Sequence, residues 1–179
     1  EATSGTACYR LALHKACTSV PPLHVVQALV NAYPKSIRIR EKFAMFPLHV
    51  ACAFRADRSV VQFLITEYPC ALKAVDAWGR LPLHVAAVAG TTYSVLYLLM
   101  ESHPQAVLQT DKRGRLPIDC VRNSNAPEKN LLISTLMTQA IQLDEPPMIP
   151  VSSNQPGSTD TTSGSKRSAA RALASPLSQ

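Results

Sequence analysis

The chain repeats itself at an interval of 35 residues. Residues 45–52 read MFPLHVAC, and residues 80–87 read RLPLHVAA. The same residue types recur at this interval in five series: His14, His49 and His84; Pro34, Pro69 and Pro104; Pro47, Pro82 and Pro117; Leu13, Leu48, Leu83 and Ile118; and Ala16, Ala51 and Ala86. A fixed period of about 20 to 50 residues indicates a stacked array, in which each unit buries its apolar face against its neighbours.

Each period predicts two helices, and residues 81–115 show them most clearly. Pro82 suits the first turn of a helix, because the N–H that proline lacks would have no partner there. Gly90 is suited to end that short helix. Residues 95–102 predict a second helix, and Pro104 stops it because a residue before proline disfavours the helical conformation. Helices this short are not stable alone, so the units must pack together.

The second helix is followed by a connection that ends in a tight turn. We expect residues 105–110 to return as extended chain to a turn at 111–115, where Gly114 can take positive φ. The turn and the helix after it, DAWGRLPLHVAA at 76–87 and DKRGRLPID at 111–119, resemble the ankyrin-repeat consensus. That consensus is a D-x-x-G turn followed by T-P-L-H-x-A-A.

The resemblance implies an all-α solenoid of ankyrin-type repeats with hairpin-like loops. It extends over residues 9–141, which divide into about four repeats: 9–45, 46–80, 81–115 and 116–141. Residues 1–8 precede the array, and the sequence leaves open whether further repeats or a catalytic domain lie upstream. Residues 142–179 are rich in Ser, Thr, Pro and Ala. We expect them to be a disordered tail, because they cannot bury enough apolar surface to offset chain entropy.

The chain departs from the ankyrin consensus in three respects. Its period exceeds the usual value of about 33 residues. The threonine before P-L-H is replaced by an apolar residue, in order Leu11, Phe46, Leu81 and Leu116. We expect that residue to pack against the next unit in place of the hydrogen bond from a threonine hydroxyl. The first unit lacks the D-x-x-G turn, and the fourth has Asp119 in place of histidine, as is typical of capping units.

The histidine series is predicted to be structural and not to bind metal. Equivalent positions in stacked helices lie on the order of 10 Å apart, whereas zinc ligands must lie about 2 Å from one ion. The ankyrin resemblance assigns the histidines a hydrogen bond between adjacent units. It gives structural roles in the repeat to six residues, which are His14, His49, His84, Pro47, Pro82 and Pro117. The same separation argues against a disulfide between Cys17 and Cys52. We expect the five cysteines to be free and mostly buried in a reducing compartment.

No motif of a known catalytic or cofactor-binding class is present. The sequence has neither a G-x-S-x-G elbow nor an H-E-x-x-H motif, and its six glycines form no phosphate-binding loop. No apolar run approaches the roughly 18 residues that a membrane helix needs. We therefore expect no enzyme activity, no cofactor, no small-molecule substrate and no membrane span.

The exposed turn tips are the predicted binding site. In ankyrin-like stacks the hairpin loops and first helices line a concave face that takes partners. Here the tips combine an aromatic centre with a basic rim, made of Phe43, Trp78, Arg80, Lys112, Arg113 and Arg115. Trp and Arg are enriched among the residues that dominate binding energy. The alternative, that these are solvated loop residues with Trp78 folded onto its neighbour, stays open.

The net charge indicates the kind of partner. Lysine and arginine exceed aspartate and glutamate by 18 to 12 in the chain and by 15 to 9 in residues 1–141, which favours an acidic protein surface or peptide. A second basic cluster, Lys35, Arg38, Arg40 and Lys42, is interpreted as the solvated edge of an extended segment. Nucleic acid is disfavoured as a partner, because the aromatic content is only 6% and no nucleic-acid-binding motif appears.

These features predict a monomeric, non-catalytic module or scaffold that binds another protein on its concave face and turn tips. We expect it to be intracellular, in the cytoplasm or the nucleus. Two alternatives stay open. The first is a regulatory or substrate-docking segment of a longer enzyme or channel, and the second is a basic nucleic-acid binder.

Overall fold

The computed structural model describes residues 12–126 and 128–144. In this part of the chain all regular elements are helices, and there are no strands. The predictions for residues 1–8 and for the tail beyond residue 144 lie outside the described residues. The elements in order are α1 (Ala12–Cys17), α2 (Leu23–Ala32), η1 (Pro34–Arg38), α3 (Pro47–Ala53), α4 (Arg58–Glu67), η2 (Pro69–Lys73), α5 (Pro82–Ala89), α6 (Tyr93–Ser102), η3 (Pro104–Leu108), α7 (Pro117–Arg122) and α8 (Lys129–Asp144).

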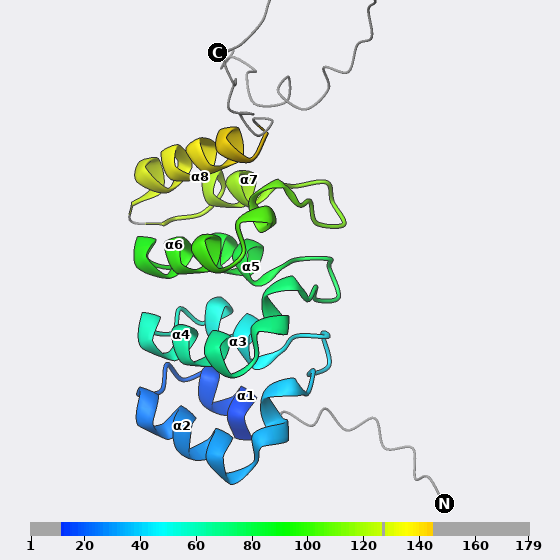
Figure 1. The fold of residues 1–179 in the computed structure, drawn as a ribbon, viewed down its shortest axis with the longest axis vertical. Helices are drawn as coiled ribbons and strands as arrows, with labels where there is room; N and C mark the ends of the chain where they lie inside the picture. Colours follow the sequence, from blue (N-terminus) through cyan, green and yellow to red (C-terminus); the bar gives the residue numbers. More distant parts are fainter. Residues whose placement is uncertain (1–11, 127, 145–179) are drawn as a thin grey trace, which may run out of the picture.

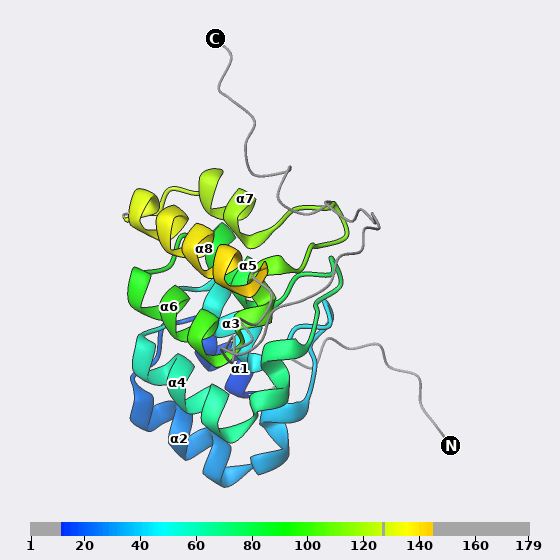
Figure 2. The same cartoon turned by 45° about the horizontal axis from the view of Figure 1, so that its top comes forward.

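The helices form a stack of pairs (Figure 1). The first helices of the pairs, α1, α3, α5 and α7, pack on one another in sequence order, and each also packs on its own second helix. The connections between pairs extend to one side as a row of hairpin loops, and the second view shows the same arrangement (Figure 2). The predicted all-α helical-repeat arrangement is therefore confirmed, and the hairpin row is the part of the stack that projects furthest from the helices.

Helices α2, α4 and α6 are each followed by a 3-10 helix, where the sequence predicted extended chain. Pro104 begins η3, and the N–H of Ala106 donates to the carbonyl oxygen of His103 at 3.1 Å. The prediction for residues 105–110 was therefore wrong over residues 105–108. Proline fixes φ near the value that a 3-10 helix also uses, so the proline that stops one helix starts the next. The chain becomes extended only at Gln109, where ψ is 141°.

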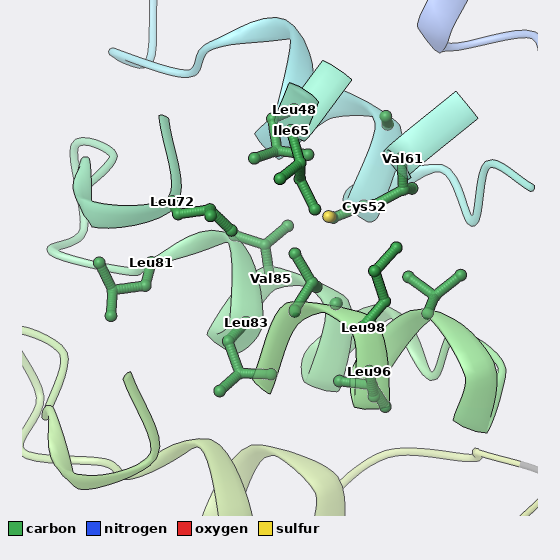
Figure 3. Close-up of a cluster of buried hydrophobic side chains, with 14 of the residues drawn as sticks. Leu48, Cys52, Val61, Ile65, Leu72, Leu81, Leu83, Val85, Leu96 and Leu98 are labelled. Atoms are coloured by element: carbon green, nitrogen blue, oxygen red, sulfur yellow. The ribbon is translucent and has the colours of Figure 1, made fainter. Parts of the chain in front are cut away.

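The core lies between successive helix pairs (Figure 3). Leu48, Leu83 and Leu96 are each 1% exposed, and burying a leucine fully is worth about 2 kcal/mol. Cys17 and Cys52 are free thiols with no exposed surface, as predicted. Removal from water raises the pKa of Cys17 to about 12, so this thiol stays protonated and packs as a small apolar side chain.

The apolar residues before P-L-H pack as the sequence predicted. Phe46 is 6% exposed and Leu81 is 1% exposed. The ring of Phe46 also meets Tyr68 edge-on, with 5.4 Å between the ring centroids. Leu116, in the fourth unit, is only half-buried, because no further unit covers it among the described residues. Leu11 lies outside the described residues.

The fourth unit ends the described stack with a polar face. Asp119 and Arg122 on α7 form an exposed ion pair of 3.7 Å. The equivalent positions on α5, 35 residues earlier, are His84 and Ala87, which are fully buried. Charged side chains on an outer face are typical of capping repeats. Residues 128–144 contain no proline, so α8 continues to Asp144. The predicted boundary between array and tail at 141/142 falls inside this helix.

One turn position is left-handed in each of the first three units, but only the third unit has glycine there. Val20, Arg55 and Gly90 are 35 residues apart and have φ of 50°, 57° and 66°. In this conformation the side chain of Arg55 reaches the end of α5. Its Nε donates to the carbonyl oxygen of Ala89 at 2.9 Å, and its Nη2 donates to that of Gly90. The arginine therefore caps the carbonyl groups at the end of the neighbouring helix.

Replacing Val20 with glycine should stabilise the protein. A β-branched residue is strained at positive φ by roughly 1–2 kcal/mol, and the Val20 side chain is 47% exposed, so little packing is lost. We expect Val20→Gly to raise the free energy of unfolding by about 1 kcal/mol in urea denaturation. Gly90→Val should lower it, since the added Cβ would lie 3.0 Å from Arg55 Nη2 and 3.2 Å from Ala126 N. A loss of stability in Val20→Gly would contradict this account.

Candidate functional site

A buried aspartate organises each of the two turns in which the D-x-x-G pattern occurs. In the first, Oδ1 of Asp76 accepts the N–H groups of Trp78 and Arg80, both at 2.9 Å. In the second, Oδ1 of Asp111 accepts those of Arg113 and Arg115 at 2.8 and 3.0 Å. The glycine of each turn takes positive φ, 75° at Gly79 and 73° at Gly114, the latter as the sequence predicted. Both tips are thereby held in one conformation.

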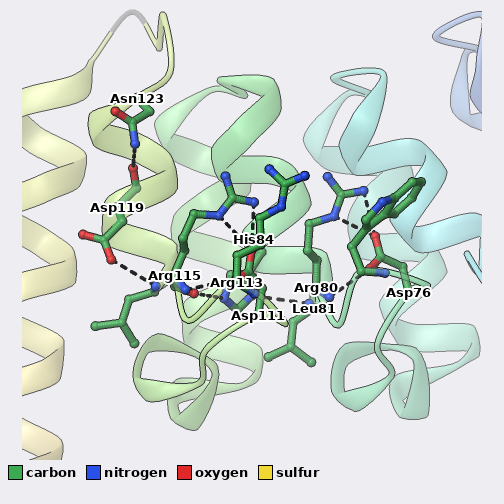
Figure 4. A network of polar contacts seen from close by, with 11 residues as sticks. Asp76, Arg80, Leu81, His84, Asp111, Arg113, Arg115, Asp119 and Asn123 are labelled. Atoms are coloured by element: carbon green, nitrogen blue, oxygen red, sulfur yellow. Dashed lines mark hydrogen bonds and ion pairs between the residues drawn. The ribbon is translucent and has the colours of Figure 1, made fainter.

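The arginine at the end of each turn neutralises its aspartate (Figure 4). Arg80 Nη2 lies 2.8 Å from Oδ2 of Asp76, and Arg115 Nη2 lies 2.8 Å from Oδ2 of Asp111. Burial acts to raise the pKa of Asp111, but hydrogen bonds from Arg115 and Arg113 outweigh it and hold that pKa below its ordinary value. Asp111 therefore remains ionised. Arg80 and Arg115, predicted as part of a basic rim, are engaged within the fold.

Two exposed aromatic rings meet at neighbouring tips. Phe43 and Trp78 occupy equivalent positions, and their ring centroids lie 5.3 Å apart with planes tilted by 30°. The guanidinium carbon of Arg80 lies 4.6 Å from the centroid of the Trp78 ring, which is a favourable cation–π distance. Trp78 therefore does fold onto its neighbour, as the alternative prediction held. It nevertheless stays 41% exposed and Phe43 stays 40% exposed.

Backbone hydrogen bonds join each tip to the next. The N–H of Ala77 donates to the carbonyl oxygen of Phe43 at 2.9 Å, and the N–H of Lys112 donates to that of Trp78 at 3.1 Å. Lys112 Nζ also donates to the carbonyl oxygen of Ala77 at 2.8 Å. Arg113 follows Phe43 and Trp78 in the 35-residue register and is exposed. The predicted site residues therefore lie in one row, in which Phe43, Trp78, Lys112 and Arg113 face solvent.

The first helices offer less accessible surface than this row of tips. Residues 47–52 of α3 and 82–87 of α5 are all buried. Their exposed large apolar side chains lie at the C-terminal ends, where Phe54 is 44% exposed and Val88 is 43% exposed. The helical part of the predicted binding face is thus confined to a few residues, and the tips carry most of the accessible aromatic surface.

Each interior histidine connects the start of its helix to the following hairpin. His49 Nδ1 accepts the N–H of Phe46 at 3.3 Å, and its Nε2 donates to the carbonyl oxygen of Ala74 at 3.0 Å. His84 repeats the pattern with Leu81 at 3.3 Å and with Arg115 at 3.2 Å. The predicted structural role is therefore observed for these two histidines. By the repeat boundaries used above, however, the bond closes within one unit and does not cross between two.

The fourth unit uses only half of this arrangement. Oδ2 of Asp119 accepts the N–H of Leu116 at 3.1 Å, as Nδ1 of the histidines does. An ionised carboxylate has no proton to donate, and among the described residues no later hairpin offers it a carbonyl group. Aspartate therefore suits the last described unit.

The structure adds residues that the sequence reasoning did not assign to the site. The sequence reasoning treated the turn aspartates only as part of the D-x-x-G motif. The signal for the two ion pairs was the spacing, because Asp76 and Arg80 are four residues apart with opposite charge, as are Asp111 and Arg115. Within residues 12–126 and 128–144, no group of three or more His, Cys, Asp or Glu side chains could hold a metal ion. None of the helices in these ranges is long and apolar enough to span a bilayer.

Comparison with known proteins agrees with the observed repeat. Residues 29–86 match a family model described as ankyrin repeats (many copies). The matched segment runs from α2 to α5 and contains the first of the D-x-x-G turns, and the helical pattern continues through α8. No curated protein matches the sequence.

The interior histidines should make stability depend on pH. A backbone N–H points at Nδ1 of His49, so this ring must be neutral, and burial lowers its pKa from 6.5 to about 4. Because the pKa in the folded state is the lower one, the stabilisation is complete above pH 6.5 and is lost as the pH falls from 6.5 towards 4. We expect a loss of about 3 kcal/mol from this residue.

Urea denaturation between pH 7 and pH 4 would measure this loss. His49→Gln has no ring to protonate, so it should be less stable than wild type at pH 7, and the difference should shrink as the pH falls. His84 should contribute in the same direction, because burial also lowers its pKa. Parallel pH curves for wild type and His49→Gln would contradict the assigned role.

Proposed function

Because the helical repeats of this chain are ankyrin repeats, we propose that it binds another protein through the tips of its hairpin loops. Ankyrin repeats are generally protein–protein interaction modules and are typically non-catalytic. The proposal here is narrower than that general role, since it names the surface. The observation that carries it is the pair of exposed rings of Phe43 and Trp78, which lie against each other at adjacent tips.

The site is rigid before any partner arrives. Asp76 fixes the turn that carries Trp78, and Arg80 supports the ring of Trp78 while remaining paired with Asp76. The backbone bond from Ala77 to Phe43 fixes the two tips relative to each other. A preformed site loses less conformational entropy on binding, so more of the contact energy appears as affinity. Partly exposed aromatic side chains on fixed loops are typical of binding hot spots.

The charge around the rings favours an acidic partner. Residues 40–43, 76–80 and 111–115 contain six basic and three acidic side chains. Two of the acidic ones, Asp76 and Asp111, are buried and paired within their own turns. The solvent-facing charges next to the rings therefore include Lys42, Lys112 and Arg113. Complementary charge of this kind speeds association and aligns the partner.

Trp78→Ala should abolish most of the affinity without unfolding the protein. The matched control is Tyr97→Ala on α6, because Tyr97 is also 41% exposed and also lies against another ring, that of Tyr93, at 5.8 Å. Arg80 is left in place, since removing it would leave Asp76 buried without its counter-charge. Circular dichroism should show equal helicity in both variants.

The measurement is affinity capture from an extract, followed by titration of the captured protein against each variant. We expect Trp78→Ala to weaken binding by about 2 kcal/mol, or roughly 30-fold, and Tyr97→Ala to leave it near the wild-type value. Equal loss in both variants, or retention of the partner by Trp78→Ala, would show that the tips are solvated loops and that the partner binds elsewhere.

A further inference from the structure

The hairpin legs present a second surface that the ring pair does not include. Each hairpin exposes the last residue of its 3-10 helix and the residues two and four positions after it. The exposed positions form three rows at the 35-residue spacing: Arg38, Arg40 and Lys42; Lys73, Val75 and Ala77; and Leu108, Thr110 and Lys112. We call these nine residues the basic hairpin face. Five of them are lysine or arginine, and none is acidic.

Contacts between rows show that these positions lie together on the surface. Arg40 Nη1 donates to the carbonyl oxygen of Val75 in the next leg at 3.3 Å. Lys112 Nζ reaches back to the carbonyl oxygen of Ala77 at 2.8 Å. The backbone bonds between tips keep the legs in register. The basic hairpin face is therefore one continuous surface across three hairpins.

Its charges are held in place and are not neutralised. The guanidinium carbon of Arg38 lies 5.7 Å from the Tyr68 ring centroid, and that of Arg40 lies 4.6 Å from the Phe46 ring centroid. Within the described residues, no ion pair joins any of the five basic side chains to a carboxylate. This distinguishes them from Arg80 and Arg115, whose charges are compensated inside the turns.

The surroundings of Lys73 agree with an uncompensated charge. Burial, and to a lesser degree the charge of Lys73, lowers the pKa of His103, so the positive charge of Lys73 acts on the neighbouring ring. Neighbouring positive charges without counter-charges repel one another, so an anion that binds there gains more electrostatic energy than one that binds at charges already paired.

The face also contains apolar groups, which decides between classes of partner. Val75 is 42% exposed and Leu108 is 43% exposed. A phosphate backbone or a layer of lipid headgroups offers such side chains nothing to pack against, whereas a protein segment can place an apolar side chain beside its carboxylates. Buried apolar contact at the centre of a charged rim is typical of protein interfaces.

We propose that the basic hairpin face binds an acidic segment of the partner protein, in which an apolar residue lies between aspartates or glutamates and packs on Val75 or Leu108. This inference rests on the proposed function, because it assigns the part of the partner that flanks the ring pair. It also gives a role to the basic cluster at residues 35–42, which the sequence alone presented as a solvated edge.

The test is fluorescence anisotropy with the whole chain and a labelled synthetic peptide of Asp and Glu with leucine at every fourth position. Comparison probes are the same peptide with serine in place of leucine, a single-stranded oligonucleotide of equal charge, and vesicles containing anionic lipid. We expect the leucine peptide to bind most tightly and its affinity to fall as salt is raised, since exposed charges are screened.

Two double variants distinguish peptide binding at the basic hairpin face from a response to the net charge of the protein. Arg38→Gln with Lys73→Gln removes two charges from the face, and neither side chain has a hydrogen bond to another described residue that the change would break. Lys15→Gln with Lys129→Gln removes two charges from helices α1 and α8, away from the hairpins. We expect about a tenfold loss of peptide affinity in the first variant and little change in the second.

Three other outcomes overturn the inference, and a fourth overturns only the proposed function. Equal losses in both double variants would mean that the peptide responds only to net charge. Tighter binding of the oligonucleotide or the vesicles would mean that the class of partner is wrong. Capture of a protein through Trp78 without peptide affinity at the face would leave the proposed function intact and overturn this inference alone. Peptide binding at the face, with a captured partner that is insensitive to Trp78→Ala, would do the reverse.

Discussion

The double hydrogen bond of the buried histidine ring is the interaction on which the rest of this structure depends. In the second and third units the ring accepts the N–H of the residue that precedes the helix and donates to the following hairpin, to Ala74 before the turn in one unit and to Arg115 at the end of the turn in the other. It therefore fixes where the helix begins and how far the hairpin stands from it. The aspartate of the turn then sets the shape of the tip, and the tip sets the direction of the aromatic rings. Packing of leucines between the pairs supplies the stability, but this polar connection supplies the register.

Much of the fold could be predicted from the sequence because its signals are local and recur. One series of prolines stops helices, the other series starts them, and Gly79 and Gly114 mark the turns. The 3-10 helices escaped prediction, because a proline that ends a helix is equally compatible with an extended segment until its hydrogen bonds are seen. The left-handed residues Val20 and Arg55 escaped as well, since neither residue type favours positive φ and the neighbouring units impose it.

The candidate site was predictable in its residues and less so in their roles. The sequence places Trp78 and Arg80 in the same turn, but it does not show that the arginine is neutralised by Asp76 or that the indole lies on Phe43. The ring contact depends on the stacking distance between units, which one unit's sequence does not contain, whereas the ion pair lies within one turn, between residues four apart. Counting lysines and arginines therefore overstates the positive charge that the tips can offer a partner. The alternate exposed residues Arg38, Arg40 and Lys42 identify charges that are not paired within the turns.

The backbone bonds between tips have a mechanical consequence. Phe43 is bonded to Ala77, and Trp78, which follows Ala77 in the same turn, is bonded to Lys112, so three successive loops are connected in series at their ends as well as through the helices behind them. A force or a bound ligand that displaces one loop must stretch a bond to its neighbour. The three tips should therefore move together as one rigid unit, and a displacement of the first tip would reach the third without passing through the core.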